Sequence, residues 1–249
     1  MINNKLLLDV FENKELKFKL STQILYGEKF RILSKNRYSY KIKTSFDNYV
    51  GYIKKQKYLN KLKSTHKVFK IKTKIFTKPF NNKKFETKNF LSFASKVSVI
   101  QVHNGYVEFE KNKWIKQQDL KKIDHTEKNY SKIFKLFLDT KYTWGGKSFN
   151  GIDCSALIQL FFLYNKKFYP RDTKDQIKFK KININSKIFK KGDIIFWNGH
   201  VAICIDGKKL IHAFGPKKKV IIMDIKKTIK QIQNNSKLYV IGKKNINDY

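Results

Sequence analysis

The sequence predicts an α+β domain preceded by two small all-β barrels. Short segments with strand-like alternation fill the first half of the chain, and a helical periodicity followed by further strands begins near residue 124. The chain has only 3 Pro and 11 Gly among 249 residues, so no long flexible linker is expected. We therefore predict barrels over residues 1–62 and 63–123, and the α+β domain over residues 124–249.

Turn dipeptides separate the strand patterns of the two predicted barrels. Asp47-Asn48 precedes one strand, and Asn104-Gly105 is typical of a two-residue hairpin turn. Each barrel would hold about 50–60 residues, a size at which small all-β barrels fold. The predicted strands are Lys29–Ile32, Ser39–Lys43, Tyr49–Ile53, Phe90–Phe93, Val97–Val102, Tyr106–Phe109 and Lys113–Ile115.

Two helices are predicted to open the α+β domain. The first follows residues 124–127, whose sequence resembles a capping box. Its apolar residues recur at helical spacing, at Tyr130, Ile133, Phe134, Phe137 and Leu138. The second begins near Cys154, ends near Tyr164 and is apolar on nearly every side, which predicts a buried central helix. The strands predicted after it are Asp193–Trp197, His200–Ile205, Lys209–Phe214, Val220–Met223 and Leu238–Ile241.

Cys154 is a candidate nucleophile because it stands at a predicted helix start. The helix dipole and the exposed N–H groups stabilise a thiolate at that position. A thiolate–imidazolium pair there would keep Cys154 reactive well below the ~8.5 of a free thiol. The alternative is a small buried hydrophobic residue, the role that we expect for Cys204.

His200 and His212 are candidates for the base and for the group that orients it. Both lie on predicted neighbouring strands, and they share a face of the sheet only if even-numbered residues pair with even-numbered ones. That register requires a connection with an odd number of residues, such as the three residues Asp206–Lys208. A two-residue turn would place the imidazoles on opposite faces. A zinc site of these histidines with Cys154 would lack an apparent fourth ligand, so no metal is predicted.

The formal net charge of +36 has two interpretations. A basic surface attracts nucleic acid, but all but three of the 55 Lys and Arg residues are lysine and they are spread along the chain. Residues with AT-rich codons (Lys, Asn, Ile, Phe and Tyr) are abundant, so we favour codon bias and predict no nucleic-acid partner.

No export or membrane signal is visible in the sequence. The apolar run Leu6–Leu8 is shorter than the ~7–15 residues of a signal-peptide core. Ala156–Leu163 is far below the ~18–20 residues that span a bilayer. Two cysteines are too few for a disulfide framework. We expect a cytoplasmic monomer without cofactor or membrane partner.

Six separated motifs occur across residues 142–213. They are Tyr142-x-Trp144-Gly145-Gly146, Asp153-Cys154-Ser155, Pro170-Arg171-Asp172-Thr173-x-x-Gln176, Gly192 to Trp197, Gly199-His200-Val201 and Ile211-His212-Ala213. In type and in order these motifs resemble the NlpC/p60 murein peptidases, a papain-like family of cysteine hydrolases. The two predicted barrels resemble the bacterial SH3-like domains that precede this domain in one subgroup.

The resemblance implies an activity and a substrate. Cys154 would be the nucleophile, His200 the base and His212 the third residue, in an enzyme that cleaves the γ-D-glutamyl–diaminopimelate (or Lys) bond of peptidoglycan stem peptides. The subgroup with SH3-like domains prefers a free N-terminal L-Ala and recycles murein peptides. Ala156, where the family usually has Gly, leaves the pocket shape open.

The resemblance also implies a set of substrate-binding residues, for several of which an ordinary structural role is an alternative. Asp153 is equally suited to cap its helix, and Arg171 to hold its own loop. Glu28 is equally suited to be a carboxylate on the surface, and Tyr52 to be a ring in the core of its barrel. The implied set is Tyr142, Trp144, Asp153, Ser155, Glu28, Tyr52 and Arg171.

Two other functions are compatible with the sequence. The same Cys-His residues could act as an amidase or acyltransferase on a different substrate. A non-catalytic protein that binds cell wall or nucleic acid is the alternative from another class.

Overall fold

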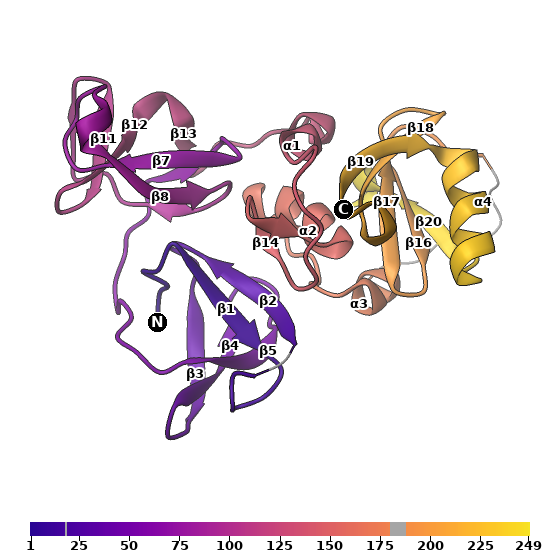
Figure 1. Cartoon of the computed structure of the whole chain (residues 1–249), viewed down its shortest axis with the longest axis horizontal. Helices are drawn as coiled ribbons and strands as arrows, with labels where there is room; N and C mark the ends of the chain where they lie inside the picture. Colours follow the sequence, from indigo (N-terminus) through magenta and orange to yellow (C-terminus); the bar gives the residue numbers. More distant parts are fainter. Residues whose placement is uncertain (18, 180–187) are drawn as a thin grey trace. The chain divides into compact units, whose positions relative to one another are not determined.

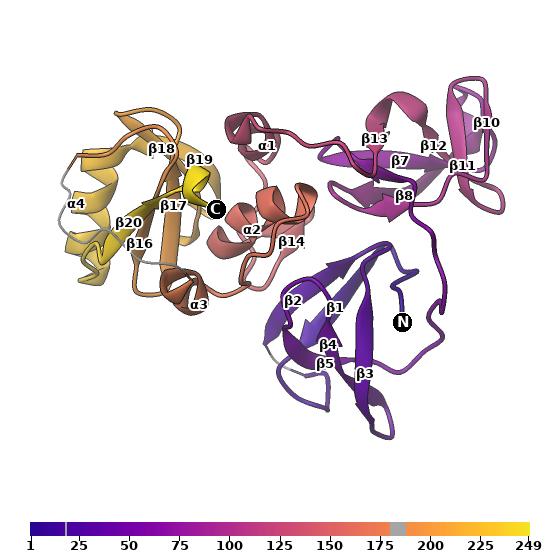
Figure 2. The ribbon, with the colours of Figure 1, turned by 180° about the vertical axis from the view of Figure 1, so that it is seen from behind.

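The computed structural model describes residues 1–17, 19–179 and 188–249, and the chain divides into two compact units. The first unit comprises Met1–Thr126 and the short segment Lys147–Phe149. The second comprises Glu127–Gly146 and Asn150–Tyr249, and it holds all four α-helices of the described residues (Figures 1 and 2). The boundaries predicted at residues 62 and 123 remain predictions. Within these ranges no helix has both the length and the apolar character needed to cross a membrane.

The first unit begins with a five-stranded antiparallel sheet of order β2-β1-β5-β4-β3. Alternate side chains such as Val10, Ile42 and Ile53 are fully buried in its core, as strand geometry requires. Asn48 adopts a left-handed conformation in the turn between β4 and β5, which Asn tolerates. The strands are β1 (Leu7–Phe11), β2 (Leu20–Leu25), β3 (Phe30–Lys35), β4 (Ser39–Thr44) and β5 (Val50–Lys54).

A second all-β module follows, with sheets of order β10-β11-β12-β7-β8 and β13-β6-β9. The predicted turn at Asn104-Gly105 is confirmed, and both residues have positive φ. Val97–Val102 is not one strand, because β9 and β10 belong to different sheets. The elements are β6 (His66–Val68), β7 (Lys72–Phe76), η1 (Lys83–Phe85), β8 (Glu86–Ser92), β9 (Lys96–Val97), β10 (Gln101–His103), β11 (Tyr106–Glu110), β12 (Lys113–Lys116), η2 (Gln117–Asp119) and β13 (Leu120–Lys122).

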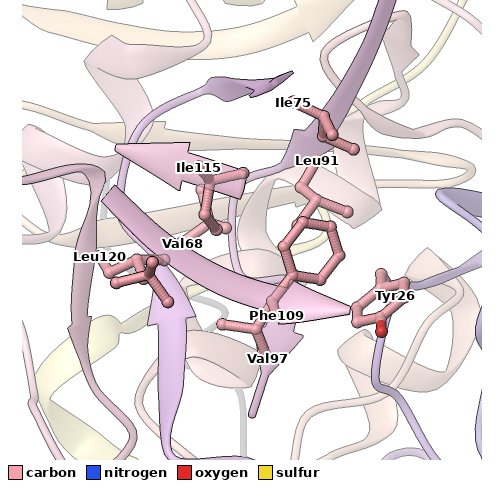
Figure 3. Packing of buried hydrophobic residues seen from close by; sticks show 9 residues of the cluster. Tyr26, Val68, Ile75, Leu91, Val97, Phe109, Ile115 and Leu120 are labelled. Carbon is pink, nitrogen blue, oxygen red and sulfur yellow. The ribbon is translucent and has the colours of Figure 1, made fainter. Parts of the chain in front are cut away.

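Tyr26 joins the two β-modules of the first unit. Its ring packs edge-on against Phe109 at a centroid distance of 5.5 Å, inside the core of the second module (Figure 3). Its hydroxyl donates to Oε1 of Glu110 over 2.7 Å, which satisfies the polar tip of a buried side chain. The residue that follows β2 therefore completes the neighbouring core.

The second unit is built on an antiparallel sheet of order β19-β18-β17-β16-β20. Helix α2 packs on β17 and β18, and α4 packs on β19; Figures 1 and 2 show these two helices on opposite sides of the sheet. The elements after Thr126 are α1 (Tyr130–Leu136), β14 (Lys147–Ser148), β15 (Gly151–Ile152), α2 (Cys154–Tyr164), α3 (Thr173–Lys178), β16 (Asp193–Trp197), β17 (His200–Cys204), β18 (Lys209–Phe214), η3 (Gly215–Lys217), β19 (Lys219–Asp224), α4 (Ile225–Ser236), β20 (Gly242–Asn245) and η4 (Ile246–Asp248).

The prediction of α2 is confirmed from its first residue to its last, and every one of its residues is buried. Four of the five predicted strands of this domain are also confirmed. The fifth, Leu238–Ile241, is wrong, because the final strand is β20. The capping box predicted before α1 is wrong as well: the helix starts at Tyr130, and the side chain of its N-cap residue, Asn129, makes no capping hydrogen bond.

Candidate active site

Cys154 is the first residue of α2, and the side chain of Asp153 caps that helix by accepting from the backbone N–H of Ala156 over 2.8 Å. The structure therefore confirms Asp153 as an N-cap, one of its two expected roles. Cys154 is 5 % exposed, so its thiol is nearly covered by protein. The backbone of Val201 and the hydroxyl of Thr173 approach the sulfur, and both lower the pKa of the thiol. The thiol therefore lies beside Val201, the second residue of β17. His200 is the first residue of that strand.

Asp153, Ser155 and Arg171 form one buried hydrogen-bonded network. Arg171 binds the two carboxylate oxygens of Asp153 with its two terminal nitrogens, at 2.9 and 2.7 Å. The hydroxyl of Ser155 accepts from Arg171 at 2.8 Å and donates to Asp153 at 3.1 Å. These contacts match the alternative in which Arg171 holds its own loop. A role of the three side chains in substrate binding stays a prediction.

His200 and His212 lie on one face of the sheet, as the predicted register requires. Cys204 pairs with Leu210, and the backbone N–H of Ile205 donates to the carbonyl of Lys209. The three residues Asp206–Lys208 therefore connect the paired residues, as predicted. Nε2 of His200 is 2.9 Å from Nδ1 of His212, a hydrogen-bond distance. The shared face is therefore confirmed.

Aromatic rings hold both imidazoles in place. Phe214 stacks on His212 with a centroid distance of 4.5 Å and an interplanar angle of 14°. Trp197 lies against His200, with a centroid distance of 5.5 Å. Across the described part of the chain, Nδ1 of His200 makes no hydrogen bond, so this nitrogen can accept a proton.

Burial favours the neutral form of each of these groups. It raises the pKa of the Cys154 thiol to about 12, with a further increase from the charge of Asp153. It lowers the pKa of His200 to about 4, and it lowers the pKa of His212 well below its usual value. Burial thus disfavours both charged forms, and the expected thiolate–imidazolium pair stays a prediction.

Tyr142 and Trp144 lie on the loop before the helix of Cys154. The ring of Tyr142 is partly buried next to Gly215, and burial together with the nearby Cys154 raises the pKa of its hydroxyl. Trp144 is 55 % exposed, an unusual position for a large aromatic ring. Both positions suit residues that contact a ligand, and their substrate-binding role stays a prediction.

Glu28 and Tyr52 belong to the first unit. The Glu28 carboxylate forms a buried ion pair with Lys147, 3.1 Å away, and accepts from the backbone N–H of Leu25 over 2.7 Å. Glu28 is thus neither an exposed nor an unpaired carboxylate. Tyr52 is partly exposed, with the ammonium of Lys41 6.0 Å from its ring centroid. Their predicted contact with a substrate amine remains a prediction.

Sequence reasoning missed two contacts of the candidate site. Thr173 follows Arg171 closely in the sequence, so the motif itself could have indicated that its hydroxyl approaches Cys154. Met223 contacts His212 from the next strand, and only the pairing of β18 with β19 reveals it. Cys204 lies in the core, as predicted. The described residues contain no cluster of His, Cys, Asp or Glu arranged to hold a metal ion.

Two family profiles match the chain. The NlpC/P60 family matches residues 139–236, which include Cys154, His200 and His212. Residues 139–236 form an NlpC/P60 domain. The bacterial dipeptidyl-peptidase SH3 domain matches residues 19–57, so the first β-module is an SH3 domain that precedes the NlpC/P60 domain.

Related sequences agree with this assignment of the NlpC/P60 domain. The chain is 30 % identical to dipeptidyl-peptidase 6 of Lysinibacillus sphaericus over 124 residues, which is 47 % of this chain and 44 % of the relative. It is 34 % identical to a probable endopeptidase NlpC homolog of Haemophilus influenzae over 92 residues, 35 % of this chain and 49 % of the relative. The chain thus spans less than half the length of each.

Solved structures of NlpC/P60 proteins share the fold. An NlpC/P60 family protein from Bacillus cereus superposes with a TM-score of 0.70 at 20 % identity, covering 83 % of this chain and 77 % of the other. An NlpC/P60 endopeptidase from Photobacterium damselae gives a TM-score of 0.55 at 11 % identity, with coverages of 95 % and 69 %. At these identities the likeness concerns the fold alone.

Proposed function

We propose that the protein is a cysteine endopeptidase that hydrolyses the γ-D-glutamyl–diaminopimelate (or Lys) bond of peptidoglycan stem peptides. The hydrogen bond between His200 and His212 carries the proposal, because the strands of both residues pack against the helix that begins with Cys154. These are a nucleophile, a base and an orienting group in a domain of the NlpC/P60 family. A relative named as a probable endopeptidase supports the reaction class.

In the first half of the reaction, Nδ1 of His200 takes the thiol proton while the Cys154 sulfur attacks the γ-carbonyl carbon of D-glutamate. His212, hydrogen-bonded to the other ring nitrogen, holds the imidazole in position and stabilises its protonated form. The backbone N–H of Cys154 has no acceptor within its own helix, since it is at the first helical position. It can therefore donate to the oxyanion of the tetrahedral intermediate.

In the second half, the imidazolium of His200 returns the proton to the leaving α-amino group of the diamino acid. The C–N bond breaks, and a thioester between Cys154 and D-glutamate remains. Water, deprotonated by His200, then attacks the thioester and releases the glutamyl product and the free thiol.

We further propose that the enzyme works as a cytoplasmic monomer in murein peptide recycling, and that the second β-module is a divergent SH3-like barrel. A preference for a free N-terminal L-Ala is part of this proposal. Glu28 is already paired with Lys147, so a substrate ammonium would have to share this carboxylate. Asp153 is likewise bound to Arg171. The preference is therefore the part of the proposal that most needs a direct measurement.

Incubation with L-Ala-γ-D-Glu-diaminopimelate, followed by mass spectrometry, tests the proposal. We expect free diaminopimelate and L-Ala-D-Glu, with no product from the Cys154→Ala variant; the Cys204→Ala variant, which changes the core thiol, serves as the control. The N-acetylated peptide should be cleaved more slowly if the free amine is recognised. Intact diaminopimelate and lysine peptides after incubation with folded enzyme would reject the proposal in favour of another amide or ester substrate.

A further inference from the structure

The outer ring nitrogen of His212 faces a thioether. Nε2 of His212 is 3.3 Å from Sδ of Met223. On the paired strands β18 and β19, His212 lies opposite Ile221 and Leu210 lies opposite Met223, so Met223 is the diagonal neighbour of His212 on the same face. His212 is completely buried. Among the described residues, its ring therefore has two hydrogen-bonding neighbours, His200 on one nitrogen and Met223 on the other.

The sulfur of Met223 can accept a hydrogen bond but cannot donate one. The contact with His212 is therefore a hydrogen bond only if Nε2 of His212 carries the proton, which makes Nδ1 of His212 an acceptor. The 2.9 Å contact then requires a proton on Nε2 of His200. Nδ1 of His200 is left with its lone pair, which is the form that a base needs.

The opposite proton arrangement is less favourable in this geometry. A proton on Nδ1 of His212 would be donated to Nε2 of His200, and the neutral His200 would then carry its own proton on Nδ1. The lone pairs of His212 Nε2 and Met223 Sδ would face each other at 3.3 Å. In that arrangement His200 has no nitrogen available to accept the thiol proton of Cys154.

We propose that Met223 is a positioning residue that selects the Nε2–H tautomer of His212 and, through it, the Nε2–H tautomer of His200. The assignment of tautomers follows from the contacts alone. Its consequence for catalysis rests on the proposed peptidase function. Met223 touches neither the substrate carbonyl nor the sulfur of Cys154 in this proposal and acts through the two rings.

Nitrogen-15 NMR of the histidine rings in the full-length protein at pH 7.5 tests the proposal without a substrate. The His200→Gln and His212→Asn variants assign the signals. We expect both rings as neutral Nε2–H tautomers in the wild type. A wild-type His212 in the Nδ1–H form would overturn the proposal, whether or not the protein cleaves any peptide.

Two substitutions of Met223 sharpen the test. Met223→Leu keeps an apolar side chain of similar size without an acceptor, and should shift His212, and with it His200, toward the Nδ1–H form. Met223→Glu supplies a carboxylate that only accepts, and should keep the Nε2–H form. Ile221→Leu, on the same strand directly opposite His212, is the matched packing control and should leave both tautomers unchanged. Unchanged tautomers in folded Met223→Leu would overturn the proposal.

Activity provides a second readout once a cleavable peptide is known. Loss of one weak hydrogen bond should lower kcat of Met223→Leu about fivefold with an unchanged KM, since fivefold corresponds to about 1 kcal/mol. Ile221→Leu should retain the wild-type kcat. A kcat loss that is equal in the two variants would assign the effect to packing and contradict the role of the sulfur. If the wild type cleaves no stem peptide, the proposed function fails and the NMR result still decides the tautomers.

Discussion

Arg171 donates hydrogen bonds to both carboxylate oxygens of Asp153, and this pair fixes the first turn of the helix that presents Cys154. The guanidinium and the carboxylate are both buried. Removal of the cation would leave the carboxylate of Asp153 charged and without its main partner. Such a buried charge is costly, far more than the loss of an exposed ion pair.

We predict that Arg171→Met lowers the free energy of unfolding by about 3–5 kcal/mol, the usual effect of removing one partner of a buried pair. Urea denaturation measures this value. Arg171→Lys keeps the charge but loses the bidentate contact, so it should lower the free energy of unfolding by less than Arg171→Met does. A decrease below about 1 kcal/mol for Arg171→Met would show that the pair is not required for the start of α2.

The thiol of Cys154 should react slowly with iodoacetamide at neutral pH. Its pKa is raised to about 12, so the thiolate fraction is small at pH 7 and grows as the pH increases. We predict an alkylation rate that rises continuously from pH 7 to pH 10 in the Cys204→Ala variant, whose remaining thiol is Cys154. Cys154→Ala should show almost no labelling, because Cys204 is fully buried. A rate that is already constant below pH 7 would instead establish the ion pair.

The low pKa of His200 should make the protein less stable in mild acid. The folded-state pKa is about 4 and the ordinary value is 6.5, so the unfolded chain binds the proton more readily between these values. The stability that depends on neutral His200 is fully present above pH 6.5 and is lost as the pH falls toward 4. We predict that wild type loses about 1–3 kcal/mol more stability than His200→Asn over this interval. Urea denaturation at pH 7 and at pH 4.5 measures the stability that each protein loses. Equal losses for wild type and His200→Asn would contradict the low pKa of His200.

The ion pair of Lys147 with Glu28 should matter for the first unit. Both side chains are buried, and the backbone N–H of Lys147 also donates to the side chain of Gln23 over 2.8 Å. We predict that Lys147→Met destabilises this unit by about 3 kcal/mol, because Glu28 remains charged and buried. The double variant Lys147→Met/Glu28→Gln should recover part of the loss, since no unpaired charge remains. Urea unfolding curves of the single and double variants provide the comparison, and identical curves would rule out this coupling.

The contrast between α2 and α4 shows how far the sequence alone could predict the fold. Helix α2 has an apolar run from Ala156 to Leu163 that only Gln159 interrupts, and it was assigned correctly. Helix α4 was missed because most of its residues are polar, although Asp224 caps it and Ile225 and Ile232 lie on its buried side. Its apolar spacing and N-cap were available signals. Lys237, with φ of 55°, ends α4 and places the last strand later than predicted.

The histidine arrangement could be predicted because it depends on strand alternation and on one short connection. The partners of the charged side chains could not. Arg171 and Asp153 are 18 residues apart, and Glu28 and Lys147 are 119 residues apart. No periodicity joins such positions, and any of the abundant lysines could have been the partner of Glu28. Burial decides these pairs, because a carboxylate removed from water needs an opposite charge.

The membership of Lys147–Phe149 in the first unit has a consequence for biosynthesis. During translation, residues 1–126 are made before Lys147, the cation that pairs with the buried carboxylate of Glu28, and domains commonly fold as they emerge from the ribosome. The first unit can therefore form its Glu28–Lys147 ion pair only after residue 147 has left the ribosome, when part of the chain beyond it has already been made.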